Sequence, residues 1–404
     1  MVQLKPSSLS EIQSHSAMDN IPKKRILDCY VWLKFGGLGK HVVIEVNGLQ
    51  AKGHQVNLAL QSVTGEFVSE IAQEVVTFGL GYRGPYSYPW MMLNLARFAR
   101  RVEPEVIISH AWSVDAMAIL ASNFCRLRPR IVLFHHTLIR NTPEPATADG
   151  KLRAWLLKQV ARYSYLRADA IVVVSPAAKM ELVSCFGVSS QRVHVLPSLW
   201  DVEKILSGAR ERVDDPWFDH DDRHVPVILG CGTLLPTKDF PMLMRAFALI
   251  RKHSPARLVI VGDGPLKSAL LGLAEKLGIT EDFRILGYQS NPAKYMARAD
   301  VFALSSVVEG FGTVLVEALL LGVPVVATNV GGPSYVLDGG RYGLLVPPQD
   351  ERAMADAIIT VLEDKSLRVR LRNMGPERAR VFEPSRTLDQ IERILLGLEP
   401  EEIN

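Results

Sequence analysis

Residues 305–332 read SSVVEGFGTVLVEALLLGVPVVATNVGG, and this stretch predicts a strand end, a helix and a second strand. The strand ADVFALSS (299–306) ends before a Gly-Phe-Gly turn, and a helix is expected from about Thr313 to Leu321. The apolar run VPVVATN (323–329) follows as the next strand. Apolar strands without alternation, separated by helices, indicate a parallel sheet that is covered on both faces.

The same alternation of short apolar runs and helical patterns continues in both directions. Further strands are expected at 25–33, 55–60, 105–109, 130–134, 169–175, 192–197, 225–232, 256–264 and 283–288. An acidic stretch that contains proline, within 201–224, separates two such series. The sequence therefore predicts two doubly wound, Rossmann-like α/β domains, with ligands bound at the carboxyl ends of the strands.

The expected boundaries follow from this division. The N-terminal domain is placed at 25–200, the linker at 201–224 and the C-terminal domain at 225–380. Residues 381–404 are expected to form a helix that packs back on the first domain. Residues 1–24 are polar, and we expect a disordered tail there.

Composition places the chain among soluble globular proteins, since 48% of its 404 residues are hydrophobic and 22% are charged. The first residues lack the apolar core of a signal peptide. No apolar run approaches the roughly 20 residues that span a bilayer. The four cysteines form no CxxC pair, which is typical of a reducing compartment. We expect a cytoplasmic protein.

Charge is distributed unevenly along the chain. Residues 1–200 contain 22 Lys and Arg against 14 Asp and Glu, whereas 201–404 contain 24 against 29. A basic half favours an anionic partner, either a membrane surface or a phosphorylated acceptor. No nucleic-acid partner is expected, because no basic stripe accompanies a recognition motif.

Two segments of the basic half, 86–104 and 151–167, combine basic residues with aromatic and aliphatic ones. Such helices can rest on anionic lipid headgroups, which predicts a protein peripheral to the cytoplasmic face of a membrane. The alternative is that the apolar residues belong to the core and the charges form a solvated face.

The two glutamates of the opening stretch define a candidate binding site. Gly310 and Gly312 let the backbone approach a ligand, and the helix that follows opens with unpaired N–H groups, which favour an anion. Helical spacing puts Glu317 on the inward stripe, where a carboxylate needs hydrogen-bond donors. A ribose diol supplies two hydroxyls to one carboxylate. Alternatively, Glu317 pairs with a core arginine or a backbone amide, and Glu309 caps the helix.

The pattern E-G-F-G-x-x-x-x-E-A, followed by G-x-P-V-V-A-T and G-G-P, resembles the E-x7-E signature of retaining glycosyltransferases with the GT-B fold. More narrowly, it resembles glycosyltransferase family four, the "glycosyl transferases group 1". The resemblance extends over about residues 25–385, with ordered blocks at 36–56, 168–182, 258–265 and 342–350. It implies a GT-B fold, in which two Rossmann-like domains face each other across a cleft.

The resemblance also implies an activity. It is metal-independent transfer of a hexose, with retention, from a nucleoside-diphosphate sugar to a lipid-linked or polysaccharide acceptor, as in the synthesis of lipopolysaccharide and other cell-envelope glycans. No cofactor is implied, and a UDP-hexose is favoured over GDP-mannose as the co-substrate. Retention by same-face attack, with the leaving phosphate helping to deprotonate the acceptor, is the family's usual proposal.

The resemblance also implies roles for residues of the second domain that match the family's motif. Glu317 would hold the ribose, Glu309 would contact the donor sugar, and Lys238 would contact the diphosphate. Thr233 stands where the family has an arginine, so either another basic group such as Lys40 replaces it or the donor is held more weakly. The backbone amides that would hold sugar and phosphate belong to Gly310, Phe311, Gly312, Thr313 and Val314.

Roles carried over to the first domain concern glycines and histidines. Gly36 and Gly37 match the glycine loop where diphosphate and acceptor meet. His136 is favoured as the histidine near the reacting centre, with His135 as the alternative. His110 ends another strand and is placed on the acceptor side, although a structural histidine bonded to backbone fits the same pattern. No ligand spacing supports a three-histidine metal site, and none is expected.

Two departures from the family pattern keep rival functions open. Tyr335 occupies a position where the family carries a glutamate, and Thr233 lacks the guanidinium. A non-catalytic subunit that binds a sugar nucleotide would tolerate both changes. A sugar-nucleotide epimerase of similar fold would need a set of acid and base carboxylates in the cleft, and none is recognised. Asp219 and Asp221 form a D-x-D that we interpret as solvated linker.

Overall fold

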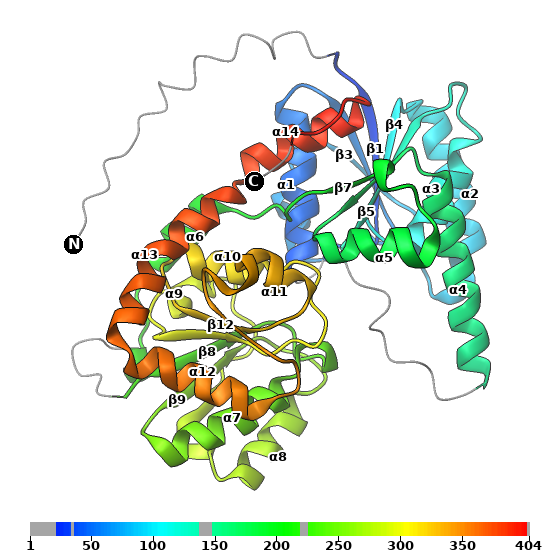
Figure 1. Ribbon diagram of the computed structural model, residues 1–404. Coiled ribbons are helices and arrows are strands. Elements are labelled where there is room, and N and C mark those ends of the chain that lie inside the picture. Colours follow the sequence, from blue (N-terminus) through cyan, green and yellow to red (C-terminus); the bar gives the residue numbers. More distant parts are fainter. Residues whose placement is uncertain (1–21, 34–35, 137–147, 219–224, 402–404) are drawn as a thin grey trace, which may run out of the picture.

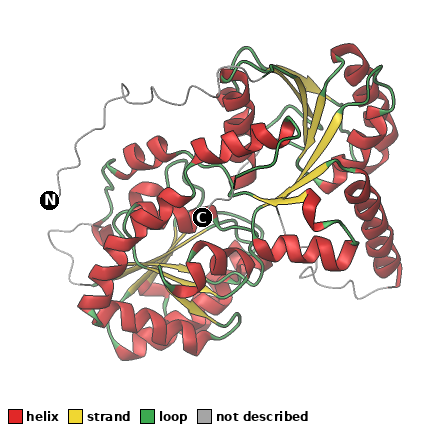
Figure 2. Cartoon of the chain, turned by 45° about the horizontal axis from the view of Figure 1, so that its top comes forward, coloured by secondary structure: helices red, strands yellow, loops and turns green. Residues whose placement is uncertain are grey.

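The computed structural model describes residues 22–33, 36–136, 148–218 and 225–401, and within them the chain forms two α/β domains (Figure 1). The first contains a seven-stranded sheet in the order β3-β2-β1-β4-β5-β6-β7, and the second a six-stranded sheet in the order β10-β9-β8-β11-β12-β13. Neighbouring strands pair in parallel in both sheets. Helices cover the sheets, as Figure 2 shows. The predicted pair of doubly wound domains is confirmed.

The elements of the first domain alternate between strand and helix. In chain order they are β1 (Arg25–Tyr30), α1 (Gly37–Ala51), β2 (Gln55–Leu60), β3 (Val76–Gly79), α2 (Tyr88–Val102), β4 (Val106–Ser109), α3 (Trp112–Ser122), β5 (Arg130–His135), α4 (Ala148–Arg167), β6 (Ala170–Val173), α5 (Pro176–Phe186) and β7 (Val193–Val195).

The second half of the chain repeats the arrangement and ends in three consecutive helices, the last of which packs on the first domain. Its elements are α6 (Val202–Ala209), β8 (Val227–Cys231), α7 (Phe240–His253), β9 (Arg257–Val261), α8 (Lys267–Leu277), β10 (Phe283–Ile285), α9 (Ala293–Met296), β11 (Val301–Leu304), α10 (Thr313–Leu320), β12 (Val325–Thr328), α11 (Gly331–Val336), β13 (Leu344–Val346), α12 (Glu351–Glu363), α13 (Lys365–Val381) and α14 (Pro384–Leu395).

Strand β1 shows how one segment serves both faces of its sheet. Successive side chains of a strand point to opposite faces. Ile26 and Tyr30 join the core cluster beneath α1, whereas Leu27 and Cys29 join the cluster beneath α2 and α3. Asp28 has the same parity as Ile26 and Tyr30, so it lies on the α1 face and is fully buried there.

The stretch 201–224, expected as a linker, is partly built into the second domain. It contains α6, which packs against α9, and Trp217 and Phe218 are buried in that domain's core. Residues 219–224, with the D-x-D of Asp219 and Asp221, lie outside the described residues. At the other expected boundary, residues 1–21 of the tail also lie outside them, while Lys24 is held by Glu105 at 3.0 Å between Nζ and Oε1.

Helix α14 returns to the first domain and completes its core, beside α1 (Figure 1). Ile391, Ile394 and Leu395 belong to the same buried cluster as Ile26. Buried Glu392 accepts hydrogen bonds from Lys52 and from the ring of His54, each at 2.8 Å. The chain therefore crosses between the domains twice, once before α6 and once after α13.

Candidate active site between the two domains

In both sheets, the loops that carry the candidate site residues leave strands at the point where the strand order reverses. In each sheet the strand order reverses between the first strand and the fourth, at β1 and β4 in one domain and at β8 and β11 in the other. The loops that leave these strand pairs diverge and open a crevice for ligands. The predicted site residues lie on these loops: Gly36, Gly37 and His110 in the first domain, and Lys238 and Glu309 in the second.

Two helix N-termini meet where the domains touch. A Cβ atom added to Gly37, at the start of α1, would lie 3.5 Å from Oγ1 of Thr313, at the start of α10. Both N-cap residues are glycines with left-handed backbones, Gly36 at φ 119° and Gly312 at φ 87°, and neither supplies a side-chain cap. Neither helix has an acidic residue in its first turn. Their unpaired N–H groups and dipoles therefore favour an anion at this position.

Gly310 is required by close contact between the domains. A Cβ atom at Gly310 would lie 2.1 Å from the carbonyl oxygen of His136, which is shorter than any tolerated contact. The backbone after β11 and the backbone after β5 are thus in contact. The donor-side motif and the favoured histidine belong to one site.

We expect Gly310→Ala to abolish most of the activity while both domains stay folded, because the added methyl forces the loop away from His136. A misplacement of about 1 Å in an active site is enough for a loss of roughly a hundredfold. Turnover and thermal unfolding measure the two effects. Gly272→Ala is the matched control, since its added Cβ meets open space. Wild-type turnover in Gly310→Ala would contradict the close contact.

Lys238, in the loop after β8, and Glu309, in the loop after β11, form an ion pair. The hydroxyl of Ser306 also donates to Oε2 of Glu309, at 3.3 Å. The hydroxyl of Ser305 donates to the backbone oxygen of Lys238 at 2.8 Å, which joins the two loops. The cation and the carboxylate are therefore held side by side, although each remains partly exposed.

Glu317 is 7% exposed on the buried side of α10, as its helical position predicts. Within the described part of the chain its carboxylate makes no hydrogen bond and no ion pair, so the alternative of pairing with a core arginine or an amide is not observed there. Burial raises the pKa of Glu317, and the charge of Lys40 opposes that shift. A desolvated acid without donors is what a ligand's hydroxyls would satisfy.

Lys40, named above as a substitute for the family's arginine, extends from α1 of the opposite domain. Burial raises the pKa of the Cys231 thiol to about 12, Glu317 acts in the same direction, and Lys40 and Lys238 oppose it. These charged groups thus share one small region at the end of β8. Thr233 itself is exposed on the same loop.

The two departures from the family pattern have different surroundings. The Thr233 loop is packed tightly against the loop after β9, because a Cβ atom on Gly262 would lie 1.9 Å from the carbonyl oxygen of Gly232. Tyr335 instead packs against Phe311 and Phe382, with ring centroids 6.4 and 5.7 Å away. The Phe311 side chain is buried in this cluster, so only its backbone remains for a ligand.

His135 and His136, at the end of β5, point to opposite faces of the sheet because successive residues of a strand alternate. Val132 and Phe134 of β5 face α1, while Leu133 faces α4, so His135 and His136 point to opposite sides. Nδ1 of His135 lies 3.0 Å from the hydroxyl of Tyr165 in α4. His136 lies on the α1 side, at the contact with Gly310. This placement favours His136 over His135.

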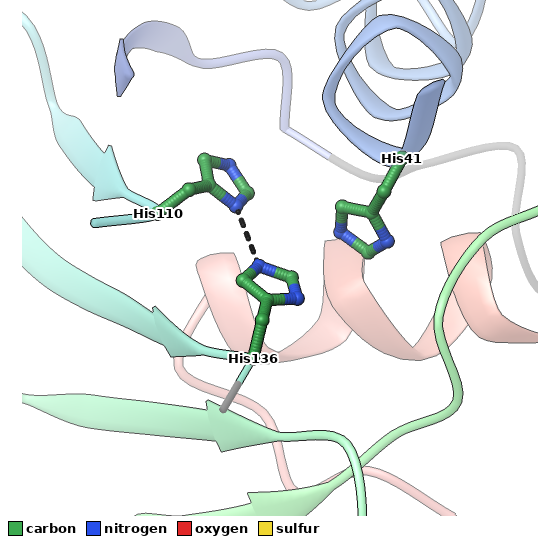
Figure 3. Close-up of side chains that lie close together, drawn as sticks. All are labelled: His41, His110 and His136. Carbon is green, nitrogen blue, oxygen red and sulfur yellow. Dashed lines mark hydrogen bonds between the residues drawn. The ribbon is translucent and has the colours of Figure 1, made fainter. Parts of the chain in front are cut away.

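His110, which we expected on the acceptor side, is 3% exposed, with 3.2 Å between its Nδ1 and Nε2 of His136 (Figure 3). The acceptor-side role stays a prediction. Three buried residues that sequence reasoning missed complete the group. Asp28 comes from β1, and His41 and Glu45 come from one face of α1.

Burial and charge set the protonation of this cluster. Burial lowers the pKa of His110, but the carboxylates of Asp28 and Glu45 outweigh it and raise the value to about 9. Burial raises the pKa of Asp28, against the opposing effect of His110. Burial and the charges of His41 and His110 lower the pKa of His136 well below its ordinary value. These shifts favour a protonated His110 and a neutral His136.

Nitrogen atoms of His41, His110 and His136 lie within 4.8 Å of one another. His110 and His136 are hydrogen-bonded to each other, and Nε2 of His41 bonds Glu45. Figure 3 shows the hydrogen bond between His110 and His136, and the ring of His41 lies 4.8 Å from that of His136 between centroids.

Comparison with known proteins agrees with this geometry. Residues 35–204 match the family described as Glycosyltransferase Family 4, and residues 219–378 match Glycosyl transferases group 1. A protein of Campylobacter jejuni is 34% identical over 312 residues, which is 76% of this chain and 81% of its relative. The chain is a glycosyltransferase of the group 1 and family 4 type. That relative is named N-acetylgalactosamine-N,N'-diacetylbacillosaminyl-diphospho-undecaprenol 4-alpha-N-acetylgalactosaminyltransferase.

Further similarities support the assignment of family and fold for this glycosyltransferase. D-inositol 3-phosphate glycosyltransferase of Corynebacterium glutamicum is 27% identical, over 88% of this chain and 90% of that one. Sucrose-phosphate synthase of Thermosynechococcus elongatus superposes with a TM-score of 0.79 at 21% identity, covering 92% of this chain and 98% of that one. HepE of Anabaena, solved with UDP and glucose, gives 0.75 at 20% identity, with 93% and 100% covered. The expected GT-B fold is confirmed.

None of the helices that the structure describes in this glycosyltransferase combines the length and the apolar character that crossing a membrane requires.

Proposed function

We propose that this glycosyltransferase moves a hexose from a nucleoside-diphosphate sugar to a lipid-linked or polysaccharide acceptor, with retention at the anomeric carbon. The observation that carries the donor assignment is the buried carboxylate of Glu317, which has no partner among the described residues, beside two helix N-termini without side-chain caps. A ribose diol satisfies the first feature and a diphosphate satisfies the second. The name of the C. jejuni relative, which specifies a diphospho-undecaprenol-linked acceptor, supports the acceptor class.

In this proposal the ribose hydroxyls donate to Glu317, and the diphosphate lies between the starts of α1 and α10. Lys238 and the backbone N–H groups of 310–314 stabilise the negative charge that develops on the leaving diphosphate. These groups take the part that a divalent metal plays elsewhere, so we propose metal-independent transfer. A UDP-hexose is the favoured donor, and the complexes of HepE with UDP-glucose and with UDP support that choice.

The reacting centre would lie between Glu309 and His136. The ion pair of Glu309 with Lys238, and the contact of the His136 backbone with the Gly310 loop, support this position. We propose same-face attack by the acceptor hydroxyl: its oxygen bonds the anomeric carbon as the bond to the diphosphate breaks, and its proton passes to a departing phosphate oxygen. Closure of the domains would exclude water.

A panel of UDP-, GDP- and ADP-sugars tests the proposal. We expect saturable thermal stabilisation by one nucleotide and release of the nucleoside diphosphate only when a lipid or glycan fraction is added. Stabilisation without turnover under every acceptor would support a non-catalytic subunit. Conversion of the sugar nucleotide without an acceptor would support an epimerase. Absence of binding to any nucleotide sugar would overturn the donor assignment.

The acceptor is proposed to reach the enzyme at an anionic membrane surface on the cytoplasmic side. Helices α2, α3 and α4 form one layer of the first domain, because α3 contacts both neighbours. Part of the apolar content of 86–104 is core, since Met91 and Leu95 are buried, but Trp90 is 57% exposed. In 151–167, Trp155 is also 57% exposed. Exposed aromatics with nearby Arg and Lys are typical of interfacial helices.

We expect the double substitution Trp90→Ser with Trp155→Ser to weaken binding to vesicles that contain anionic phospholipid, by roughly tenfold or more, because each exposed indole would otherwise enter the headgroup region. Vesicle sedimentation at low and high salt measures the change. Leu271→Ser is the control, since Leu271 is 47% exposed on α8 of the other domain. Equal sedimentation of the double variant and the wild type would contradict the proposal that Trp90 and Trp155 bind the membrane.

A further inference from the structure

A buried chain of hydrogen bonds lies behind His136. Nε2 of His110 is 3.3 Å from Oδ2 of Asp28 and 3.5 Å from Oε2 of Glu45, and its Nδ1 is 3.2 Å from Nε2 of His136. Asp28, Glu45 and His110 are almost completely removed from solvent. Strands β1, β4 and β5 and helix α1 each contribute to the group, so it exists only in the folded domain.

The position of each proton follows from the partners. The backbone N–H of Leu199 donates to Nδ1 of His41 at 2.9 Å, so His41 carries its proton on Nε2 and donates it to Glu45 at 3.1 Å. Nε2 of His110 faces only carboxylate oxygens, which are acceptors, so it carries a proton. Whether Nδ1 of His110 is also protonated decides the state of His136.

Charge balance answers that question. Oδ1 of Asp28 and Oε1 of Glu45 are buried, and neither has a hydrogen-bond partner in the described part of the chain. Two buried carboxyl groups, each with one oxygen left unpaired, need a cation close by, and His110 is the group between them. With both ring nitrogens protonated, His110 donates from Nδ1 to Nε2 of His136. The proton of neutral His136 then resides on Nδ1.

The remaining ring nitrogen of His136, Nδ1, is the one left to bind a ligand. Among the described residues, Nδ1 of His136 has no hydrogen-bond partner, and the backbone of this residue touches the Gly310 loop. A proton fixed on Nδ1 makes this atom a donor toward an oxygen, and never an acceptor. Without that constraint, an imidazole exchanges its proton between the two nitrogens.

We propose that Asp28, Glu45 and His110 are positioning residues that fix the tautomer of His136 and so present its Nδ1–H to an oxygen of the sugar or diphosphate. The identity of that ligand rests on the proposed function, whereas the tautomer does not. The physical principle is general: the hydrogen bond made by one ring nitrogen of a histidine determines whether the other nitrogen carries the proton. It explains why a buried acid interrupts β1 and why His41 and Glu45 share one face of α1.

Long-range ¹H–¹⁵N spectra of the full-length protein, labelled in its histidine rings, test the proposal directly. We expect His110 to be doubly protonated at neutral pH and His136 to be neutral with its proton on Nδ1. His110→Asn and His136→Gln assign the signals. The groups that face His110 are Asp28 on β1, His41 and Glu45 on α1, Asp115 on α3 and His136 after β5, so the titration is recorded from about pH 5 to pH 10. Neutral His110, or a proton on Nε2 of His136, would overturn the proposal.

Two substitutions at His110 separate positioning from packing. Asparagine retains one N–H donor near the Nδ1 position but carries no charge, so His136 should keep its tautomer while its pKa rises toward 6.5. Leucine removes the donor, so the Nε2–H tautomer should appear, and turnover should fall by about a hundredfold, the usual loss for one preorganised donor. Greater turnover by His110→Asn than by His110→Leu is expected. Equal tautomers in the two variants would contradict the proposal that His110 fixes the tautomer of His136.

These spectra need no substrate, so the two proposals can fail separately. If the protein shows the expected tautomers but binds no nucleotide sugar, the proposed function is refuted and the tautomer proposal stands. If it turns over a nucleotide sugar while His136 carries its proton on Nε2, the tautomer proposal is refuted and the proposed function stands. Should either substitution at His110 prevent folding, the wild-type spectra, with His136 assigned by His136→Gln, decide the matter.

Discussion

Lys238→Met is expected to lower kcat by roughly a hundredfold to a thousandfold, which is the usual effect of removing one preorganised group from developing charge. Lys238 is held at the site by its ion pair with Glu309, and its loop is tied to β11 through Ser305. Methionine preserves the length of the side chain and removes the cation. The loss should appear in kcat more than in the dissociation constant of the free nucleotide, because the charge on the leaving diphosphate increases in the transition state.

Steady-state turnover, with nucleotide affinity measured separately, checks this expectation. Lys252→Met is the matched control, since Lys252 is exposed on α7 of the same domain. The double variant Lys238→Met with Glu309→Gln should lose less than the two single losses combined, because the two side chains act as a pair. A Lys238→Met enzyme with kcat within threefold of the wild type would remove Lys238 from the chemistry.

Glu317→Gln is expected to raise the dissociation constant of the nucleoside diphosphate by roughly tenfold to a hundredfold. Hydrogen bonds to a charged group contribute about 1.5–3 kcal/mol each, and the neutral amide accepts only one strong bond of this kind. Calorimetric titration of the free nucleotide measures the change. Glu363→Gln, on a side chain that is 62% exposed in the same domain, is the control. Unchanged affinity would contradict the ribose role.

The same substitution should leave the ligand-free protein at least as stable as the wild type. Burial raises the pKa of Glu317, so the folded state holds this proton more tightly than the unfolded state does. The destabilisation by the ionised group therefore grows as the pH rises above the ordinary value of 4.5 and is absent below it. Thermal unfolding at pH 7.5 should give Glu317→Gln an equal or higher Tm, and the difference should vanish in acid.

Much of the second domain's site could be predicted from sequence because its chemistry lies within one βαβ unit. The expected helix from Thr313 to Leu321 is α10, Thr313–Leu320, and helical spacing alone put Glu317 on its buried side. The missed strands are β3 and β13, each at the edge of its sheet. Edge strands are short and partly exposed, as Val76–Gly79 and Leu344–Val346 are, so they lack the apolar run that marks a central strand.

The first domain's site was less accessible to sequence reasoning, because its members come together only through the sheet. Asp28, His41 and Glu45 each lie in an apolar element, where a single polar residue carries no distinctive signal. Strand parity shows that His135 and His136 point to opposite faces, but not which face holds the ligand. That choice depends on α1 and α14 covering one side of β5 and α4 the other.

Helix α14 has a consequence for how the protein is made. The N-terminal half emerges from the ribosome first, yet three apolar side chains of its core, Ile391, Ile394 and Leu395, are synthesised only after the whole second domain. The buried partner of His54, Glu392, arrives with them. The first domain therefore keeps part of an apolar face uncovered until the second domain has been synthesised. Maturation of the two halves is coupled by the order of synthesis as well as by their contact.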